Sequence, residues 1–344
     1  MKISLLSFNT TTPSVGLKIM IRLGRGRCGA HLTLLFSIED YSDDPLSQGS
    51  LGVGICLEDG VEAFAKGEEG ENKLEVVFIT GNGDCRLYEE VLKYLSEEIP
   101  EVLGLSWELK IKLELPTSQG FGMSASGAIA AAEAFQRAIG IPYEECRRRA
   151  LLIAHLVERD RSTGLGDTTA LSAGGVERRI KAGSPYSGKK LMNGPGISEG
   201  WSENIPVLLV WKERTGTHTA DYIDNKNWRG KISNAGLAQM NRLSEGDWNR
   251  NRWKEILSSS QKFVEESKLL DDLSRNELRE ITKNCLISMG IENKFVPLLC
   301  MLGESIAIVP KDVSSNFEEI TLISKKLQNL GVLTALSRIG EVRN

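Results

Sequence analysis

The distribution of hydrophobic residues divides the chain into parts with different periodicity. Up to about residue 115, short apolar runs alternate with glycine-rich turns, a pattern that predicts β-strands. The runs are LTLLF at 32–36, GVGICLE at 52–58, VEAFA at 61–65, LEVVFIT at 74–80 and LSWELKIKLEL at 105–115. Between the last two runs, apolar residues recur at helical spacing over residues 85–99. We therefore expect a mixed sheet with one crossover helix.

The next segment changes to helical patterns. Small and apolar residues run without a break through SASGAIAAAEAFQRAIG at 124–140. A second helical pattern, PYEECRRRALLIAHLVERD at 142–160, opens with a proline that suits a first turn. We expect these two helices to cover the sheet. After a polar stretch at 183–200, the apolar run IPVLLVWK at 205–212 predicts a new strand and places a boundary near residue 203.

The rest of the chain mixes helices and strands. The patterns predict helices over about 230–290, a strand in MLGESIAIV at 301–309, a helix in EEITLISKKLQNLG at 318–331 and a last strand in GVLTALSRI at 331–339. We therefore expect an α+β protein of two domains, residues 1–203 and residues 204–344.

The N-terminus leaves two interpretations open. Because Met20 is a second plausible start, residues 1–19 are either an extension outside the core fold or, with Lys18 to Leu23, part of the first strand. The apolar part of this segment is too short for a signal peptide, and no apolar run in the chain reaches the roughly 20 residues of a membrane helix. We therefore expect a cytoplasmic protein.

Composition narrows the classes of partner. The chain has 344 residues, with 42 Lys and Arg against 46 Asp and Glu, which gives a net charge of −4. It carries no excess positive charge for a nucleic acid or an anionic membrane surface, and we expect it to bind neither. The six cysteines are scattered and form no C-x-x-C pair, which indicates reduced thiols. The oligomeric state stays open, a homodimer included.

Two glycine patterns resemble nucleotide-binding motifs without the context that these motifs need. GRGRCG at 24–29 spells G-x-G-x-x-G, but an apolar β-like run follows it, whereas a dinucleotide fingerprint opens a helix. A dehydrogenase that binds NAD there is therefore a weak alternative. GSPYSGKK at 183–190 nearly spells a P-loop, but Lys190 stands where a Ser or Thr should reach the magnesium, and no apolar strand precedes it.

A third glycine pattern lies between a strand and a helix. PTSQGFGMSASG at 116–127 begins where KIKLEL ends and runs into the alanine-rich helix. A helix N-terminus leaves backbone N–H groups unpaired and carries partial positive charge, so it can bind phosphate without a lysine. An ordinary capped helix is the alternative. The residues that we assign to this anion site are Pro116, Gly120, Phe121, Gly122, Met123, Ser124, Ala125 and Ser126.

This segment resembles the P-x-x-x-G-L-G-S-S-A-A signature of the GHMP kinases, the superfamily that includes galactokinase, homoserine kinase and mevalonate kinase. Here Phe121, Met123 and Ser126 depart from that signature. HLVERDRSTGLGDTTALSAGG at 155–175 is similar to the superfamily segment with a metal-ligand Glu and a catalytic Asp. The resemblance implies a two-domain GHMP kinase fold that uses ATP and Mg²⁺. It assigns Mg²⁺ to Ser124 and Glu158, and the proton of the acceptor hydroxyl to Asp167.

Within the superfamily, the sequence is most similar to the archaeal pantoate kinases. The similarity lies in GAHLTLLFSI at 29–38 and DPLSQGSLGVGICLEDGVE at 44–62, in addition to the two motifs above. It implies transfer of the γ-phosphate of ATP to the primary hydroxyl of pantoate, giving 4-phosphopantoate on the route to coenzyme A. Gly29, Ala30 and Leu34 depart from the sequence pattern of the archaeal pantoate kinases. The resemblance therefore defines the phosphoryl transfer better than it defines the acceptor substrate.

Pantoate carries one carboxylate, so its pocket needs a cation. A guanidinium offers a bidentate fork, which makes Arg179 or its neighbour Arg178 the leading partner. His155 lies three residues before Glu158, on the same helix face, and can bind a substrate hydroxyl. Further candidates for substrate contact are His31, Ser50 and Thr215. The alternatives are a kinase of another small alcohol, of the homoserine or mevalonate type, and a GHMP-fold sensor that binds nucleotide and metabolite without turnover.

Overall fold

A sheet of six strands carries the first part of the protein in this computed structural model, which describes residues 20–213, 226–314 and 317–342. Its strands are β1 (Arg22–Glu39), β2 (Gly49–Glu69), β3 (Leu74–Thr80), β4 (Leu105–Leu113), β5 (Val176–Lys181) and β8 (Ile197–Trp201). The order is β3-β4-β2-β5-β8, with β1 also paired to β2. Only β3 and β4 run parallel among these pairs, so the expected mixed sheet is confirmed.

The two longest strands of this sheet are β1 and β2. They pair antiparallel from Arg22 opposite Gly67 to Glu39 opposite Gly49. The separate strands expected at 52–58 and 61–65 are therefore wrong, because both lie within β2. Gly60 between them is not a turn residue. Its missing side chain allows a close approach, since a Cβ there would lie 2.2 Å from the carbonyl oxygen of Cys28 in β1.

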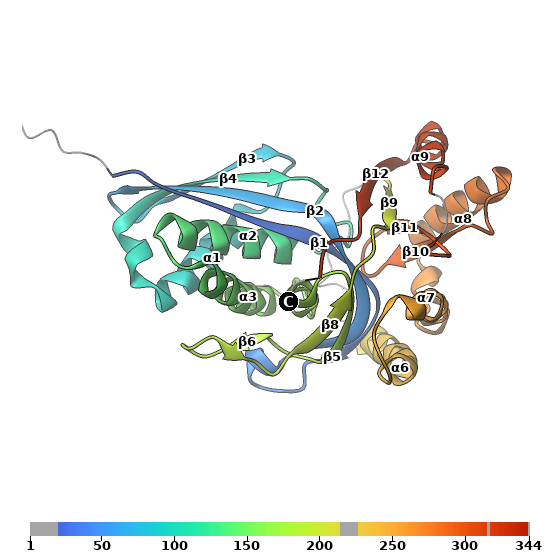
Figure 1. The fold of residues 1–344 in the computed structure, drawn as a ribbon, viewed down its shortest axis with the longest axis horizontal. Helices are drawn as coiled ribbons and strands as arrows, with labels where there is room; N and C mark the ends of the chain where they lie inside the picture. Colours follow the sequence, from blue (N-terminus) through green and yellow to red (C-terminus); the bar gives the residue numbers. More distant parts are fainter. Residues whose placement is uncertain (1–19, 214–225, 315–316, 343–344) are drawn as a thin grey trace, which may run out of the picture.

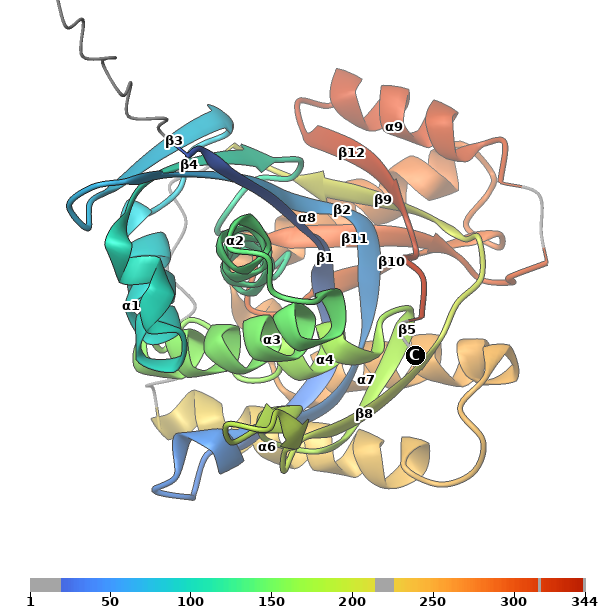
Figure 2. The ribbon, with the colours of Figure 1, turned by 60° about the vertical axis from the view of Figure 1, so that its left-hand side comes forward.

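Four helices cover one face of the sheet (Figures 1 and 2). They are α1 (Cys85–Glu98), α2 (Met123–Ala138), α3 (Tyr143–Asp160) and α4 (Asp167–Ala173). Helix α2 packs directly on β1 and β2, whereas α3 packs on α2 and α1, one layer further from these strands. Both consecutive helices thus lie over the sheet as expected, α2 in direct contact with it and α3 behind α2. Almost every residue of α2 is buried, which explains its unbroken run of small and apolar residues.

Alternating residues of β1 explain the G-x-G-x-x-G pattern. Gly24 and Gly26 face α2, and a Cβ on either glycine would lie 2.0 Å from a helix carbonyl oxygen, that of Ala134 or Ala130. The arginines between and after them point to the other face of the sheet. The pattern lies within a strand and opens no helix. Its first two glycines serve strand–helix packing, whereas Gly29 lies against the carbonyl oxygen of Leu57 in β2.

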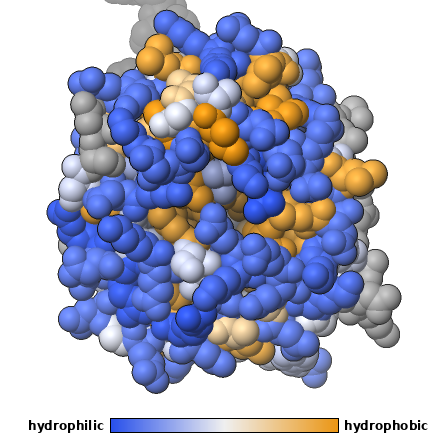
Figure 3. All heavy atoms as spheres, turned by 90° about the vertical axis from the view of Figure 1, so that its right-hand side faces the viewer, coloured by the Kyte–Doolittle hydropathy of each residue, from blue (hydrophilic) through white to orange (hydrophobic). Residues whose placement is uncertain are grey.

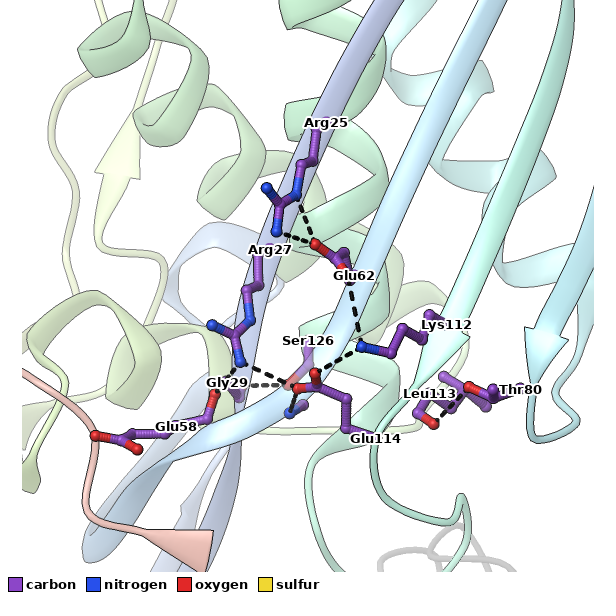
Figure 4. Close-up of polar contacts among 11 residues, drawn as sticks. Arg25, Arg27, Gly29, Glu58, Glu62, Thr80, Lys112, Leu113, Glu114 and Ser126 are labelled. Carbon is purple, nitrogen blue, oxygen red and sulfur yellow. Dashed lines mark hydrogen bonds and ion pairs between the residues drawn. The ribbon is translucent and has the colours of Figure 1, made fainter.

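The other face of the sheet carries a row of alternating charges across β1, β2 and β4 (Figure 4). Arg25 pairs with Glu62, which lies 3.7 Å from Lys112, and Lys112 lies 3.3 Å from Glu114. At the end of the row, Arg27 pairs with Glu114, with Nη2 of the arginine 3.2 Å from Oε2 of the glutamate. Because the arginines are at least half exposed, each pair stabilises the protein by at most about 1 kcal/mol.

A four-stranded antiparallel sheet carries the rest of the protein, in the order β10-β11-β9-β12. Its strands are β9 (Pro206–Trp211), β10 (Phe295–Cys300), β11 (Ser305–Pro310) and β12 (Leu333–Arg338). Its helices are α6 (Lys226–Leu243), α7 (Trp253–Glu266), α8 (Leu273–Ser288) and α9 (Ile320–Asn329). Strand β10 was not predicted, and the strand expected from Met301 begins only at Ser305, after a turn. The mixture of helices and strands confirms the α+β class.

The two sheets share one hydrophobic core. Helices α6 and α7 follow the second sheet's first strand in sequence, yet both pack against β1 of the first sheet. Strands β8 and β9 lie in different sheets on either side of residue 203, and the division of the chain into two domains at that residue stays a prediction. Shorter elements complete the structure: β6 (Tyr186–Ser187), β7 (Met192–Asn193), and 3₁₀ turns at Pro45–Ser47, Pro100–Gly104, Arg250–Arg252 and Leu269–Asp271.

The polar stretch with GSPYSGKK folds as the small hairpin of β6 and β7, and no helix follows its glycine and lysines as a P-loop requires.

Figure 3 shows that the face on the right-hand side of Figure 1 is mainly hydrophilic and is interrupted by patches of apolar side chains. In the parts of the chain that the structure describes, no helix combines the length and the apolarity needed to cross a membrane.

The contact of β1 with α2 can be tested at Gly26. We expect Gly26→Ala to lower the free energy of unfolding by about 1–3 kcal/mol, because the added methyl group meets backbone atoms that must move apart. Gly104→Ala is the matched control, since a Cβ there would meet nothing within 4 Å. Urea denaturation of both variants measures the difference, and equal stabilities would contradict this account of the G-x-G-x-x-G pattern.

Candidate active site

A cavity of about 370 Å³ lies between the helices and the two sheets. One group of lining residues comes from the start of α1 and the end of α3 and includes Asp84, Tyr88 and Arg161. A second group comes from the glycine loop and the first residues of α2: Thr117, Ser118, Gly120, Phe121, Gly122, Met123 and Ser124. A third group comes from β1, β2, β5, the loop before α4 and the first residue of α4: Thr33, Phe36, Ser50, Leu165, Gly166, Asp167 and Arg179. The turn between β10 and β11 adds Met301 and Leu302.

The glycine loop presents the start of α2 to this cavity. Gly122 has a φ of +60° and precedes the helix, and no side chain caps the helix's first amide groups. Those amides therefore stay available to an anion. Gly120, with a φ of +78°, packs against Gly303 so closely that a Cβ would lie 2.9 Å from its Cα.

Only some of the residues that we assigned to the anion site line the cavity. Gly120, Phe121, Gly122, Met123 and Ser124 line the cavity, together with Thr117 and Ser118, which sequence reasoning missed. The other three do not line it: Pro116, Ala125 and Ser126. Ser126 serves the fold instead, because its hydroxyl lies 2.6 Å from the carbonyl oxygen of Gly29 in β1. Ala125 is fully buried in the core.

Two carboxylates meet at Gly164, in the loop between α3 and α4. A Cβ on Gly164 would lie 1.8 Å from Oε2 of Glu158 and 3.0 Å from Oδ2 of Asp167. Asp167 lines the cavity, while Glu158 lies behind Gly164 and is 3% exposed. The hydroxyl of Thr163 donates to Oε1 of Glu158 at 2.8 Å, but Oε2 has no hydrogen-bond partner among the described residues.

The environment separates the pKa values of these two carboxyl groups. Burial, and then the charge of Asp167, raise the pKa of Glu158 to about 7 against hydrogen bonds from Ser124 and Thr163. Burial also acts to raise the pKa of Asp167, but the hydrogen bond and charge of His31 and the charge of Arg179 outweigh it and lower that pKa. Asp167 is thus the carboxyl group that stays ionised at neutral pH.

His31 lies behind Asp167 and does not line the cavity, contrary to the expectation that it contacts substrate. It is fully buried, with Nδ1 2.5 Å from Oδ1 of Asp167 and Nε2 3.0 Å from Oε1 of Glu177. Glu177, equally buried, was missed by sequence reasoning. The alternation in VERR could have found it, because it places Glu177 and Arg179 on one face of β5.

Glycines in β2 make room for these side chains. Residues directly opposite each other in neighbouring strands point to the same face of a sheet. Phe36, Gly52 and Arg179 form one such row across β1, β2 and β5. A Cβ on Gly52 would lie 2.3 Å from Nη2 of Arg179, so a larger residue would displace the guanidinium.

Arg179 and Arg178 point to opposite faces of β5. Arg179 lines the cavity and is 1% exposed, with its Nε 3.7 Å from Oε2 of Glu177. Its Nε and Nη2 have no hydrogen-bond partner among the described residues. Arg178 pairs with Glu199 and lies over the ring of Trp248, 4.8 Å from its centroid, away from the cavity.

Of the remaining candidates, Ser50 lines the cavity beside Gly166. His155 does not line it, because its ring is buried and holds the fold together. Its Nε2 lies 2.9 Å from the carbonyl oxygen of Pro45 and its Nδ1 lies 3.3 Å from the hydroxyl of Thr168. Burial lowers the pKa of His155 to about 4, so the ring is neutral. Thr215 lies outside the described residues.

Comparison with known proteins shows similarity to kinases in one domain of the sequence and in the overall fold. The family model described as GHMP kinases N terminal domain matches residues 86–175. A solved structure of a phosphotransferase related to the CoA biosynthesis pathway superposes with a TM-score of 0.70 at 26% identity, covering 92% of this chain and 96% of that chain. Homoserine kinase from Cytophaga hutchinsonii superposes with a TM-score of 0.61 at 13% identity, covering 98% of both chains. Residues 86–175 thus match the GHMP kinase N-terminal domain, as the sequence motifs implied, and the fold of the chain is similar to that of these two solved structures.

The curated proteins to which the chain is similar in sequence are pantoate kinases. The chain is 36% identical over 192 residues to pantoate kinase from Thermococcus kodakarensis, a match that covers 55% of this chain and 59% of the relative. It is 29% identical over 164 residues to pantoate kinase from Methanospirillum hungatei, covering 45% of this chain and 52% of the relative. The matches therefore span between half and three-fifths of these relatives.

The electrostatic coupling of the two carboxyl groups can be measured. In Asp167→Asn we expect the pKa of Glu158 to fall below its value of about 7, because the neutral amide removes the neighbouring charge. A ¹³C NMR titration of glutamate-labelled protein would follow the carboxyl group, and Glu158→Gln would identify its signal. An unchanged pKa for Glu158 in Asp167→Asn would show that the charge of Asp167 does not contribute to it.

Proposed function

We propose that the protein is an ATP-dependent kinase that phosphorylates the primary hydroxyl of pantoate, giving 4-phosphopantoate for coenzyme A biosynthesis. The observation that carries this proposal is the guanidinium of Arg179. It is almost fully buried, has hydrogen-bonding groups without partners, and lines the same cavity as Asp167 and the glycine loop. Because buried N–H groups without hydrogen-bond partners are costly, this arrangement favours a carboxylate-bearing substrate.

The phosphates of ATP would lie on the glycine loop. The uncapped amides at the start of α2 and the partial positive charge of that helix suit a triphosphate. A transfer then forms a bond between the acceptor oxygen and the γ-phosphorus and breaks the bond from that phosphorus to the oxygen bridging to the β-phosphorus, so ADP leaves. The proton of the acceptor hydroxyl passes to Asp167, which stays ionised at neutral pH and lines the cavity.

The residues Ser124 and Glu158 fit a magnesium ion. Ser124 lines the cavity, and Oε2 of Glu158 is a buried carboxylate oxygen without a hydrogen-bond partner among the described residues. Both are hard oxygen donors, and Mg²⁺ commonly takes only one or two protein ligands beside phosphate and water. When bound, the ion would neutralise charge on the phosphates.

The acceptor would lie between β1, β2 and β5. Arg179 offers its guanidinium to the carboxylate, and Ser50 offers a hydroxyl beside it. Phe36, Met301 and Leu302 supply apolar surface for the methyl groups of pantoate. An assay of ADP release with pantoate, homoserine and mevalonate tests the substrate, with ³¹P NMR to identify the product. We expect turnover with pantoate; preference for another alcohol would replace the substrate, and no turnover would favour a sensor.

Arg179→Lys tests the carboxylate contact. We expect the KM for pantoate to rise about 10- to 100-fold, because an ammonium cannot replace the bidentate fork, while the KM for ATP changes little. Arg178→Lys is the matched control, because that side chain points to the opposite face of the same strand. Steady-state kinetics measures all three proteins. Equal effects of the two variants on the pantoate KM would contradict the assignment.

Glu158→Gln tests the metal site. We expect the Mg²⁺ concentration for half-maximal activity to rise about tenfold or more, because the amide removes the ligand charge, as losses of metal-site partners commonly do. Glu145→Gln, an exposed residue on the same helix, is the control and should leave the Mg²⁺ dependence unchanged. A normal Mg²⁺ dependence in Glu158→Gln would remove this residue from the metal site.

A further inference from the structure

The imidazole of His31 lies between two carboxylates. Its Nδ1 lies 2.5 Å from Oδ1 of Asp167, and its Nε2 lies 3.0 Å from Oε1 of Glu177. Ionised carboxylates only accept hydrogen bonds, so each ring nitrogen must donate. Between two ionised carboxylates, His31 would carry a proton on both nitrogens and one positive charge, although it is fully buried.

His31 belongs to a row of alternating charges in the order Asp167, His31, Glu177, Arg179. Asp167 and Arg179 line the cavity at the two ends of the row, while His31 and Glu177 do not line it. The inner pair is wholly shielded from water, with both side chains 0% exposed. Buried charges persist only when they are paired, so removing either inner residue leaves another charge without compensation.

The backbone of His31 connects this row to the glycine loop. Its amide donates to the carbonyl oxygen of Phe121 at 3.0 Å. A Cβ on Gly122 would lie 3.2 Å from Cβ of His31, and a Cβ on Gly54 would lie 2.3 Å from its Nε2. The ring thus has little room to move, and one residue contacts both the loop and the carboxylate.

We propose that His31 and Glu177 are positioning residues that hold Asp167 ionised and at a fixed place relative to the glycine loop. The catalytic effect of this positioning rests on the proposed kinase activity. The arrangement of charges around His31 does not depend on turnover. During transfer the acceptor proton goes to Asp167, and His31 keeps both of its protons. Glu177 acts through His31 and does not touch the substrate.

The charged and titratable groups around His31 are Asp167 from α4 and Glu177 from β5, which contact its ring, and the thiol of Cys56 opposite it in β2. Arg179 lies one step further away, 3.7 Å from Glu177. Burial lowers the pKa of His31, but the hydrogen bonds and charges of the two carboxylates outweigh burial and raise it above 6.5. The charge pairing therefore stabilises the folded state fully below pH 6.5 and is lost as pH rises through the raised pKa.

The ring itself is the first readout. The chain has three histidines, so ¹⁵N-histidine labelling gives few signals. At pH 7.5 we expect one ring with two protonated nitrogens, whose signals disappear in His31→Asn. In Glu177→Gln we expect this ring to lose its proton at a lower pH than in the unchanged protein. A His31 ring with one unprotonated nitrogen at pH 7.5 would overturn the proposal whatever the protein phosphorylates.

The second readout is catalysis. We expect His31→Asn to lower kcat about 10²-fold, within the range of general-base effects, and to change the KM values for ATP and acceptor less than about threefold. His31→Lys restores a cation beside Asp167 and should regain about tenfold of that loss. Glu177→Gln should lower kcat and move the alkaline decline of kcat to lower pH.

Glu133→Gln is the matched control, because it also neutralises a buried carboxylate in an ion pair, with Arg147 at 2.9 Å, away from the cavity. It should lower stability without moving kcat or its pH profile. If His31→Asn and Glu177→Gln only lower stability as Glu133→Gln does, the positioning role fails. If the unchanged protein phosphorylates no acceptor while the ring is doubly protonated, the proposed function fails and the charge arrangement stands.

Discussion

The close approach of β1 to α2 is the constraint on which the site depends. Gly24 and Gly26 let the strand lie against the carbonyl groups of the helix, and Ser126 ties the first turn of the helix to the same strand. The start of α2 therefore has a fixed position relative to His31, whose amide bonds to Phe121. Contacts with β1 therefore position both the amide groups at the start of α2, which can bind an anion, and the carboxylate of Asp167, which can accept a proton.

The second constraint is the burial of charge. Glu158, Asp167, Glu177, His31 and Arg179 gather in a space from which most water is excluded, and each loses hydration there. Such groups are stable only as compensating partners, which is why Asp167 stays ionised while Glu158 takes the raised pKa. The alternation of charge along this row sets the chemistry of the cavity, because the two end groups, a carboxylate and a guanidinium, line the cavity and can bind a ligand there.

Local patterns in the sequence predicted most of the helices, because these depend on periodicity over many residues. The glycine loop was also predictable, since strand, glycine and helix start lie within a few positions. Strand β10 was missed because Pro297 interrupts a short run, and β2 was divided because Gly60 reads as a turn residue. His31 and His155 were assigned to substrate because a sequence shows residue type but not which oxygens surround a ring. Glu177 was missed because its partner lies 146 positions away.

The turn between β10 and β11 joins the two sheets at the glycine loop. Met301 donates its amide to the carbonyl oxygen of Thr33 in β1, Gly303 lies against Gly120, and the hydroxyl of Ser305 donates to the carbonyl oxygen of Gln119. Arg275 of α8 in turn donates to the carbonyl oxygen of Gly303 at 3.0 Å. The glycine loop is thus held from both sides. A displacement of α8 would therefore move this loop, so the shape of the first sheet's cavity depends on the firm attachment of the second sheet and its helices.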